Sequence, residues 1–430
     1  MKFTNVAMSI SVMLVISGCG GGGTGSDPIT PAVQTVATVP MVNKIVPMKI
    51  FGTSYENKNL INFDQTQIPT VRYLNIPKVY SDEQDSNERS VTFGDFFQEG
   101  KHSVFVSSTR ASNLYGIPNI NDVPGVAYFL SKDANGNWKD RSNELLKSVD
   151  DRKTCISTSY SITADFNNDS KPDVYIACNG VDYDIRFLGF SLTELINRWS
   201  SNQIIFLSQS DGTYKRIEVP FQIYGHQAAA ADINGDGNID IITINALGGD
   251  YDNSVDRVSV LLGKGDGTFT QNNSIIPRTS ALADITGMWN INLIPIDGRL
   301  DLVLAQDLFT IWIKGDKKGG FDWTSMKKFV MPISASKGTR YGTPLDVVYD
   351  NGYFYFYSTS QWDPAGAEWA IIKYSTDAIN SSIIYTFDNP TTSMKPYSAQ
   401  FKPTASGSFV AYSGGCAINS GGCAMNVKYK

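Results

Sequence analysis

Short runs of apolar, β-branched and aromatic residues follow one another along most of the chain, separated by turns rich in glycine and aspartate. Such runs are typical of strands, whereas the i, i+3, i+4 spacing of apolar residues that marks a helix is nearly absent. The pattern therefore predicts an all-β fold made of many short strands. Runs of this kind lie at 103–106, 173–177, 240–244, 301–304 and 353–357.

The predicted strands form a loose repeat. An aspartate followed by an apolar residue opens each unit, and this opening recurs at intervals of about 50 to 70 residues. Later in each unit an apolar strand leads into an Asp-Gly type of turn and then an aromatic residue, which is a hairpin signal. Each unit therefore predicts four antiparallel strands. The opening aspartates are Asp95, Asp165, Asp232, Asp284 and Asp346.

Four antiparallel strands per repeat are typical of the blade of a β-propeller. A single four-stranded sheet cannot bury both faces alone, so neighbouring blades pack on each other around an axis. The five openings and the strands near the C-terminus give six blades, and residues 43–90 are long enough for a seventh. We therefore expect a propeller of six or seven four-stranded blades over 43–430. A strand from 45–50 or 71–76 would complete the last blade and hide its edge.

One segment departs from the strand pattern. Residues 191–194, Ser-Leu-Thr-Glu, have the sequence of a capping box, which marks the start of a helix. We expect a short amphipathic helix, inserted in the unit that begins at Asp165, with a packing role rather than a ligand-binding one. Its apolar stripe would consist of Leu192, Leu195, Ile196 and Trp199.

The N-terminus has the features of an export signal: Lys2, an apolar stretch over 6–16, and small residues before Cys19. Residues 16–19, Ile-Ser-Gly-Cys, also resemble a lipobox, and the alternative is an ordinary signal peptide in which Cys19 is incidental. The composition of 20–42 predicts a flexible linker. We therefore expect a signal peptide over 1–19 and a lipoprotein held on the membrane through Cys19. In similar lipoproteins, glycine after the cysteine implies the bacterial outer membrane, facing the periplasm or the surface.

Charge and cysteine content narrow the class of protein. The formal net charge of −6 argues against a nucleic-acid partner, which would favour a basic face. Apart from Cys19, the even number of remaining cysteines indicates disulfides in an exported chain, and their spacing does not fit a CxxC zinc site. Pairing by proximity gives Cys155–Cys178 and Cys416–Cys423.

The strongest chemical signal is the loop 232–240, Asp-Ile-Asn-Gly-Asp-Gly-Asn-Ile-Asp. Alternate positions of a tight loop point inward, and calcium prefers oxygen ligands. Gly237 permits the sharp turn because glycine adopts positive φ without strain. A hairpin of Asx turns without metal is the alternative, but it needs one acid rather than three in register. We predict a Ca2+ site formed by the side chains of Asp232, Asn234, Asp236 and Asp240 with the backbone carbonyl of Asn238.

A second loop, 165–173, repeats this order of oxygen ligands but has Ser170 in place of the glycine. Serine at positive φ costs about 1 kcal/mol, which a bound cation would offset. We predict a second Ca2+ site here, and no metal in the decayed loops of the other units. The ligands would be Asp165, Asn167, Asp169, Asp173 and, as the counterpart of Asn238, Lys171.

The loop 232–240 resembles the DxDxDGxxD calcium loop of FG-GAP/VCBS repeats, which is also found in integrin α-subunit propellers. Residues 225–230 and 261–269 are similar to the same family, and the resemblance extends over roughly residues 91 to 330. It implies a propeller in which these loops join the inner strands of a blade and hold calcium structurally.

The sequence favours a binding module that grips a protein or a glycan over an enzyme. Only His102 and His226 are histidines, and there is no GxSxG, HExxH, P-loop or Rossmann glycine pattern. The alternative is a polysaccharide-active lyase or hydrolase that uses loop carboxylates such as Asp250, Asp252 and Asp256. A purely structural envelope component is the third reading.

Overall fold

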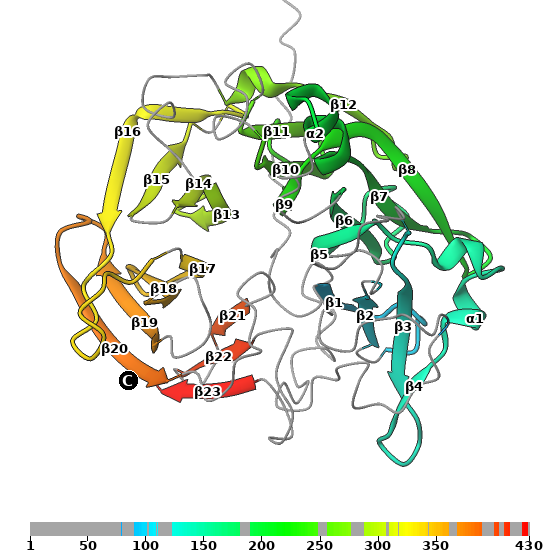
Figure 1. Ribbon diagram of the computed structural model, residues 1–430, viewed down its shortest axis with the longest axis horizontal. Helices are drawn as coiled ribbons and strands as arrows, with labels where there is room; N and C mark the ends of the chain where they lie inside the picture. Colours follow the sequence, from blue (N-terminus) through cyan, green and yellow to red (C-terminus); the bar gives the residue numbers. More distant parts are fainter. Residues whose placement is uncertain are drawn as a thin grey trace, which may run out of the picture. The chain divides into compact units, whose positions relative to one another are not determined.

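The computed structural model describes residues 79, 90–100, 103–108, 110, 123–180, 190–247, 256–276, 288–306, 309–316, 318–342, 344–360, 368–388, 400–403, 408–412 and 424–428. The chain divides into two units, Met1–Pro40 and Met41–Lys430, and every described residue belongs to the second. These residues form antiparallel sheets (Figure 1).

Five of the sheets have four strands each, and in each of them strands adjacent in sequence are adjacent in the sheet. Blade 1 contains β1 (Ser90–Gly94), β2 (Ser103–Ser107), β3 (Ala127–Lys132) and β4 (Trp138–Asp140). Blade 2 contains β5 (Ser157–Ala164), β6 (Asp173–Asn179), β7 (Ser201–Ser208) and β8 (Tyr214–Ile223). Blade 3 contains β9 (Gly225–Ala231), β10 (Asp240–Asn245), β11 (Val258–Gly263) and β12 (Phe269–Gln271).

Blade 4 contains β13 (Met288–Ile296), β14 (Arg299–Gln306), β15 (Phe309–Gly315) and β16 (Phe321–Val330). Blade 5 contains β17 (Pro344–Asp350), β18 (Tyr353–Thr359), β19 (Glu368–Ser375) and β20 (Ser381–Asp388). A sixth sheet has three strands, β21 (Gln400–Pro403), β22 (Ser408–Tyr412) and β23 (Ala424–Lys428). The helical segments are α1 (Ser142–Leu145), α2 (Leu192–Trp199) and two 3-10 turns, Asp150–Arg152 and Asn273–Ile275.

The sheets are arranged as blades around a centre, with the first strand of each sheet innermost (Figure 1). The inner strands β1, β5, β9, β13, β17 and β21 contact one another in that order. The predicted all-β propeller is therefore confirmed. The predicted number of blades is wrong, because the described residues form five four-stranded blades. The C-terminal segment supplies three strands rather than four, and the segments expected to add a strand, 45–50 and 71–76, lie outside the described residues.

Hydrophobic clusters between adjacent blades hold the propeller together. The second strand of each of blades 1 to 3 is buried along its whole length, and blades 2 and 3 each have a neighbouring blade on either side. Between blades 4 and 5, Phe329 packs against Phe354 and Phe356 with ring centroids 5.2 Å apart in both pairs. Burial of such aromatic side chains contributes about 2 to 3 kcal/mol each, so these interfaces are the main source of stability.

Helix α2 forms where the capping box predicted it. The Ser191 side chain accepts a hydrogen bond from the backbone N–H of Glu194, and the Glu194 carboxylate accepts one from the N–H of Ser191. Leu195 and Trp199 are buried against Leu247, which follows β10 of blade 3. The predicted stripe is only partly buried: Leu192, the first residue of the helix, is 52% exposed and does not belong to the cluster that buries Leu195 and Trp199.

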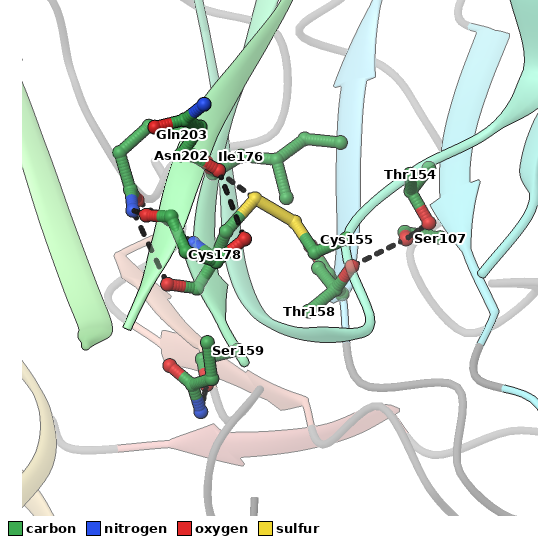
Figure 2. Close-up of a disulfide and its surroundings, with 12 residues drawn as sticks. Ser107, Thr154, Cys155, Thr158, Ser159, Ile176, Cys178, Asn202 and Gln203 are labelled. Atoms are coloured by element: carbon green, nitrogen blue, oxygen red, sulfur yellow. Dashed lines mark hydrogen bonds between the residues drawn. A yellow bond between two sulfur atoms is a disulfide. The ribbon is translucent and has the colours of Figure 1, made fainter. Parts of the chain in front are cut away.

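The disulfide Cys155–Cys178 forms as predicted (Figure 2). Cys178 lies in β6, whereas Cys155 lies just before β5 rather than in a strand. Both cysteines are buried, and Gln203 of β7 holds the backbone on either side of Cys178 through its amide group. The bridge therefore fixes the start of β5 to the end of β6. The second predicted pair, Cys416–Cys423, lies outside the described residues.

Replacing Cys155 and Cys178 together by alanine should lower the free energy of unfolding by about 3 kcal/mol, because the bridge spans 23 residues and restricts the unfolded chain. Urea unfolding of the variant and of the parent, followed by circular dichroism, measures the difference. Wild-type protein unfolded in the presence of a reductant is the control and should show the same loss. Equal midpoints in all three samples would show that the bridge adds nothing.

Candidate functional site

The first connections of blades 1, 2 and 3, which are 95–102, 165–172 and 232–239, share one hydrogen-bond pattern. In the third blade the two carboxylate oxygens of Asp232 accept the backbone N–H groups of Asp236 (3.0 Å) and Gly237 (2.9 Å). The opening aspartates of the other two loops accept the N–H groups four and five residues later in the same way: Asp165 from Asp169 and Ser170, and Asp95 from Glu99 and Gly100.

The three loops also share their backbone conformation. In each loop, the residues three and five positions after the opening aspartate have positive φ. Ser170 has a φ of 65°, as the sequence predicted, and Gly237 has a φ of 91° at the equivalent position. Non-glycine residues are strained in this region, so the loop shape is maintained by its hydrogen bonds even where the sequence disfavours it.

A second contact, shared by several blades, involves the first residue of the second strand in blades 1 to 3. We call this residue the closing residue. In blade 3 this is Asp240, which is fully buried. Its Oδ2 accepts the N–H of Ile233 (2.8 Å), and its Oδ1 accepts the N–H of Gly263 at the end of β11 (2.8 Å). Asp240 thus joins the loop to the third strand. Burial raises the pKa of Asp240 to about 7.

The closing residue of blade 2, Asp173, makes equivalent contacts. It accepts the N–H of Phe166 (2.7 Å) and both the N–H and the hydroxyl of Ser208 at the end of β7 (2.7 Å each). Burial raises the pKa of Asp173 to about 7. In blade 1 the closing residue is Ser103, whose hydroxyl accepts the N–H of Phe96 (2.8 Å) without introducing a charge.

In blade 4 the equivalent contact is made by Asp301, the third residue of β14, and this carboxylate has a different neighbour. It accepts the N–H of Gly315 (2.9 Å), as its counterparts do in blades 2 and 3, but it also pairs with Arg299 through Nε (3.0 Å) and Nη2 (3.1 Å). The indole N–H of Trp312 completes its partners (2.9 Å). Within the described part of the chain, no lysine or arginine forms an ion pair with Asp173 or Asp240. One closing carboxylate therefore has a cation from the protein, and two do not.

The other residues of the 232–240 loop are more exposed than Asp232 and Asp240. Asn234 is half-buried and donates through Nδ2 to the exposed Asp236 (2.9 Å), which also accepts the N–H of Asn238 (2.8 Å). Among the described residues, no three His, Cys, Asp or Glu side chains are grouped closely enough to hold a metal ion as they stand. The loop also contains the side-chain oxygen of Asn234 and the backbone carbonyl of Asn238, which are neither acidic nor His or Cys groups. The carboxylates of Asp232 and Asp240 keep lone pairs that no N–H group uses.

The predicted ligands of the 165–173 loop are tied to the end of β7. Asn167 Nδ2 donates to the carbonyl of Ser208 (3.1 Å), and the Ser208 hydroxyl, which donates to Asp173, also lies 3.0 Å from the carboxylate of Asp169. The Lys171 ammonium donates to the carbonyl of Gln209 (2.7 Å). Asp165 and Asp173 lie at the two ends of the loop as predicted, so the arrangement matches that of 232–240 apart from these side-chain bonds.

Several sequence candidates do not enter this site. His226 is buried beside Tyr224, with ring centroids 5.2 Å apart. Asp256 accepts a hydrogen bond from Asn273 Nδ2 (2.7 Å). The sequence predicts that a unit opens at Asp284, but the fourth blade turns at 297–298, after β13, so the repeat is shifted there. Cys19, His102, Asp250, Asp252 and Asp284 lie outside the described residues.

Sequence reasoning missed a buried carboxylate between blades 4 and 5. Glu368, at the start of β19, accepts the hydroxyls of Ser334 (2.6 Å), Tyr341 and Ser336. Burial alone would raise the pKa of Glu368, but the three hydroxyl donors outweigh it and lower that pKa. The contacts join the 331–343 connection to blade 5. No sequence signal marks them, because the partners are far apart in the chain.

The lowered pKa of Glu368 makes its contribution to stability depend on pH. A carboxyl group with a lower pKa in the folded state stabilises the protein above the unfolded pKa, about 4.3, and loses this effect as pH falls through the folded value. Glu368→Gln should therefore cost about 1 to 3 kcal/mol at pH 7 and less at pH 3. Urea unfolding of the variant and of the parent across this range tests the prediction. A cost independent of pH would contradict it.

No protein-family model matches the chain, and no curated protein matches it significantly. Among solved structures, a putative 6-phosphogluconolactonase from Bacteroides uniformis ATCC 8492 has 12% identity and a TM-score of 0.42, covering 79% of this chain and 84% of that chain. Bacteroides ovatus Xyloglucan PUL GH43B has 12% identity and a TM-score of 0.27, covering 72% and 45%. Trypanosoma rangeli sialidase has 9% identity and a TM-score of 0.33, covering 76% and 52%. At these values the likeness says nothing about activity or ligand.

Proposed function

We propose that this chain is a calcium-stabilised propeller of the FG-GAP/VCBS kind that serves as a binding module for a protein or a glycan. Lipidation of Cys19 would anchor it to the outer membrane, with 20–42 as the tether. The observation that carries the proposal is the difference between the two ends of the blades. One end is closed by short, mutually bonded loops, whereas at the other end long connections join the second and third strands of blades 1 to 3.

Calcium is supported by the comparison of equivalent carboxylates. The guanidinium of Arg299 compensates Asp301, whereas Asp173 and Asp240 occupy the same position without a cation from the protein. A buried carboxylate needs a counter-charge or a proton. In these two loops the sequence supplies further oxygen-bearing residues before the closing aspartate, as Ca2+ requires, and the loop before Arg299 lacks them. Bound calcium would supply the missing positive charge.

At the end of the blades that carries the acidic loops, the strands are joined by short turns that bond to one another. The turns between third and fourth strands lie at the same end, at 133–137, 209–213, 264–268, 316–320 and 376–380. Neighbouring loops bond to one another: Asn168 Nδ2 donates to Asn238 Oδ1 (2.8 Å), and the N–H of Gly267 donates to the carbonyl of Phe166 (3.0 Å). These contacts leave little of this end free to adapt to a partner.

The opposite strand ends are joined by longer segments. In blades 1 to 3, the second and third strands are connected through 108–126, 180–200 and 246–257. Binding residues are concentrated on such connections when a rigid scaffold presents them. Helix α2 and the Cys155–Cys178 bridge stabilise the scaffold at this end. We therefore place the binding surface there. No helix in the described part of the chain is long and apolar enough to cross a membrane, and the proposed anchor is the lipid.

The test is capture of partners from envelope extracts and from a panel of bacterial and host glycans, with and without EGTA. Retention of one ligand that survives washing and is lost in EGTA would support the binding module. For a binding module no glycan should be turned over, either by the parent or by the Asp250→Asn, Asp252→Asn and Asp256→Asn variants. Turnover of a glycan that these substitutions abolish, while retention persists, would favour the polysaccharide-active enzyme instead. Cys19→Ala should move the protein out of the membrane fraction; an unchanged distribution would overturn the anchor.

A further inference from the structure

The two loops proposed to bind calcium belong to adjacent blades and contact each other directly. Asn168 donates through Nδ2 to the side-chain oxygen of Asn238 (2.8 Å). Asn168 belongs to the 165–173 loop, where it follows the predicted ligand Asn167. Asn238 belongs to the 232–240 loop, and its backbone carbonyl is itself a predicted ligand. This hydrogen bond, which we call the amide bridge, therefore joins one set of predicted ligands to the other.

The turn between β11 and β12, at 264–268, packs on the amide bridge. Gly265 in this turn has a φ of 74°, which glycine adopts without strain. A Cβ at this position would lie 2.3 Å from Asn238 Oδ1 and 2.4 Å from Asn168 Nδ2. The turn therefore limits the positions that the two amide groups can adopt, even though the rest of the Asn168 side chain is exposed.

The same turn also connects the two closing aspartates through backbone groups. Asp240 accepts the N–H of Gly263, at the end of β11 (2.8 Å). Within the turn that follows, the N–H of Gly267 donates to the carbonyl of Phe166 in the neighbouring loop (3.0 Å). The N–H of Phe166 in turn donates to Asp173 (2.7 Å). Two separate sets of hydrogen bonds thus join the loops, one through side chains and one through the backbone.

We infer that the two loops bind calcium cooperatively, so that occupation of either loop raises the affinity of the other. This inference rests on the calcium sites proposed above. A loop loses conformational freedom when its ligands converge on an ion. Because the amide bridge and the turn tie the loops together, ordering of one loop also orders part of the other, which then loses less freedom when it binds. The coupling is reciprocal, and one hydrogen bond can carry about a fivefold change in affinity.

Calorimetric titration of the chelator-treated full chain with calcium measures the coupling. Asp169→Ala should leave only the 232–240 loop able to bind, and Asp236→Ala only the 165–173 loop, so these two single-loop variants give the affinity of each loop alone. For independent loops, the product of the two association constants of the parent equals the product of the constants of the single-loop variants. The ratio of the two products is the coupling factor, and we expect it to be about five.

Asn168→Gly tests whether the amide bridge is the cause. The substitution removes the amide group, and glycine readily adopts the φ of 59° that Asn168 has. When the single-loop variants are rebuilt on this background, the coupling factor should fall towards one. A substitution that merely loosens the 165–173 loop would weaken binding without changing the factor. Asn351→Gly is the matched control, because Asn351 has a φ of 50° in the hairpin of blade 5 and also loses an amide bond, to Asp350.

Amide hydrogen exchange gives a second measurement that needs no binding constants. In Asp169→Ala, calcium should fill only the 232–240 loop and still slow exchange of the Phe166 N–H in the other loop. Adding Asn168→Gly should reduce this slowing. A coupling factor of one in the parent, or equal factors in the parent and in Asn168→Gly, would overturn the inference and leave the proposed calcium sites standing. A parent that binds no calcium would overturn both.

Discussion

Calcium should raise the melting temperature of the chelator-treated protein by several degrees. A ligand present at 100 times its dissociation constant adds about 2.7 kcal/mol per site, and the loops 165–173 and 232–240 provide two sites. The ion would supply the positive charge that the buried Asp173 and Asp240 lack. Thermal unfolding after EGTA treatment, with and without added Ca2+ and with Mg2+ for comparison, measures the effect.

Asp236→Asn separates this effect from ordinary destabilisation. Asp236 is exposed, and its charge acts against ionisation of Asp232 and Asp240. The substitution should therefore leave the calcium-free protein as stable as the parent or slightly more stable, while it removes much of the gain from calcium. Asp266→Asn, an exposed turn aspartate of the same blade, should have equal effects in both conditions. If EGTA leaves the melting temperature of the parent protein unchanged, the loops are Asx-type hairpins without metal.

The fold and the loop conformation could be predicted because the signals are local. Asp232 and Gly237 lie within one loop, and the contact between the carboxylate and the N–H is set by spacing alone. The capping box of Ser191 and Glu194 is local in the same sense. Even the positive φ of Ser170 follows from its place in the repeat. What one loop or one helical turn determines can be inferred from a single sequence.

The number of blades could not be predicted, because the signals that mark each unit are also local. An aspartate opening marks a hairpin rather than a complete sheet, so counting openings does not show how many strands the ends of the chain contribute. The shift at blade 4 has the same origin, because Asp284 imitates an opening but precedes the first strand of the blade. Glu368 and Ser334 are 34 positions apart in the sequence, and only the packing of blade 5 against the preceding connection brings them into a hydrogen bond.

The Arg299–Asp301 pair could not be inferred either. The two residues are separated by one position, and in an extended strand such residues point to the same side, but nothing in the sequence shows that Asp301 is fully buried. In the structure the carboxylate of Asp301 is 0% exposed and the side chain of Arg299 18% exposed. In blade 4 the guanidinium of Arg299 supplies the counter-charge that we propose calcium supplies in blades 2 and 3.

Arg299→Ala should consequently be among the most destabilising single substitutions in the protein, at about 3 to 5 kcal/mol. Removing one partner of a buried ion pair leaves the other charge uncompensated. Arg299→Lys should restore only part of the loss, because an ammonium cannot form the two bonds that Nε and Nη2 make. Urea unfolding at pH 7 measures these differences, and they should be the same with and without calcium.

The double variant Arg299→Ala with Asp301→Asn decides whether charge is the cause. Once Asp301 carries no charge, loss of the guanidinium should matter less, so the double variant should be more stable than the sum of the two single losses implies. The coupling energy between Arg299 and Asp301 should be large. No coupling is expected between Arg299 and Asp240, which belong to different blades. Strictly additive losses at Arg299 and Asp301 would show that Arg299 acts through packing of its aliphatic stem. In that case, we could no longer argue that the Arg299 guanidinium does in blade 4 what the proposed bound cation does in blades 2 and 3.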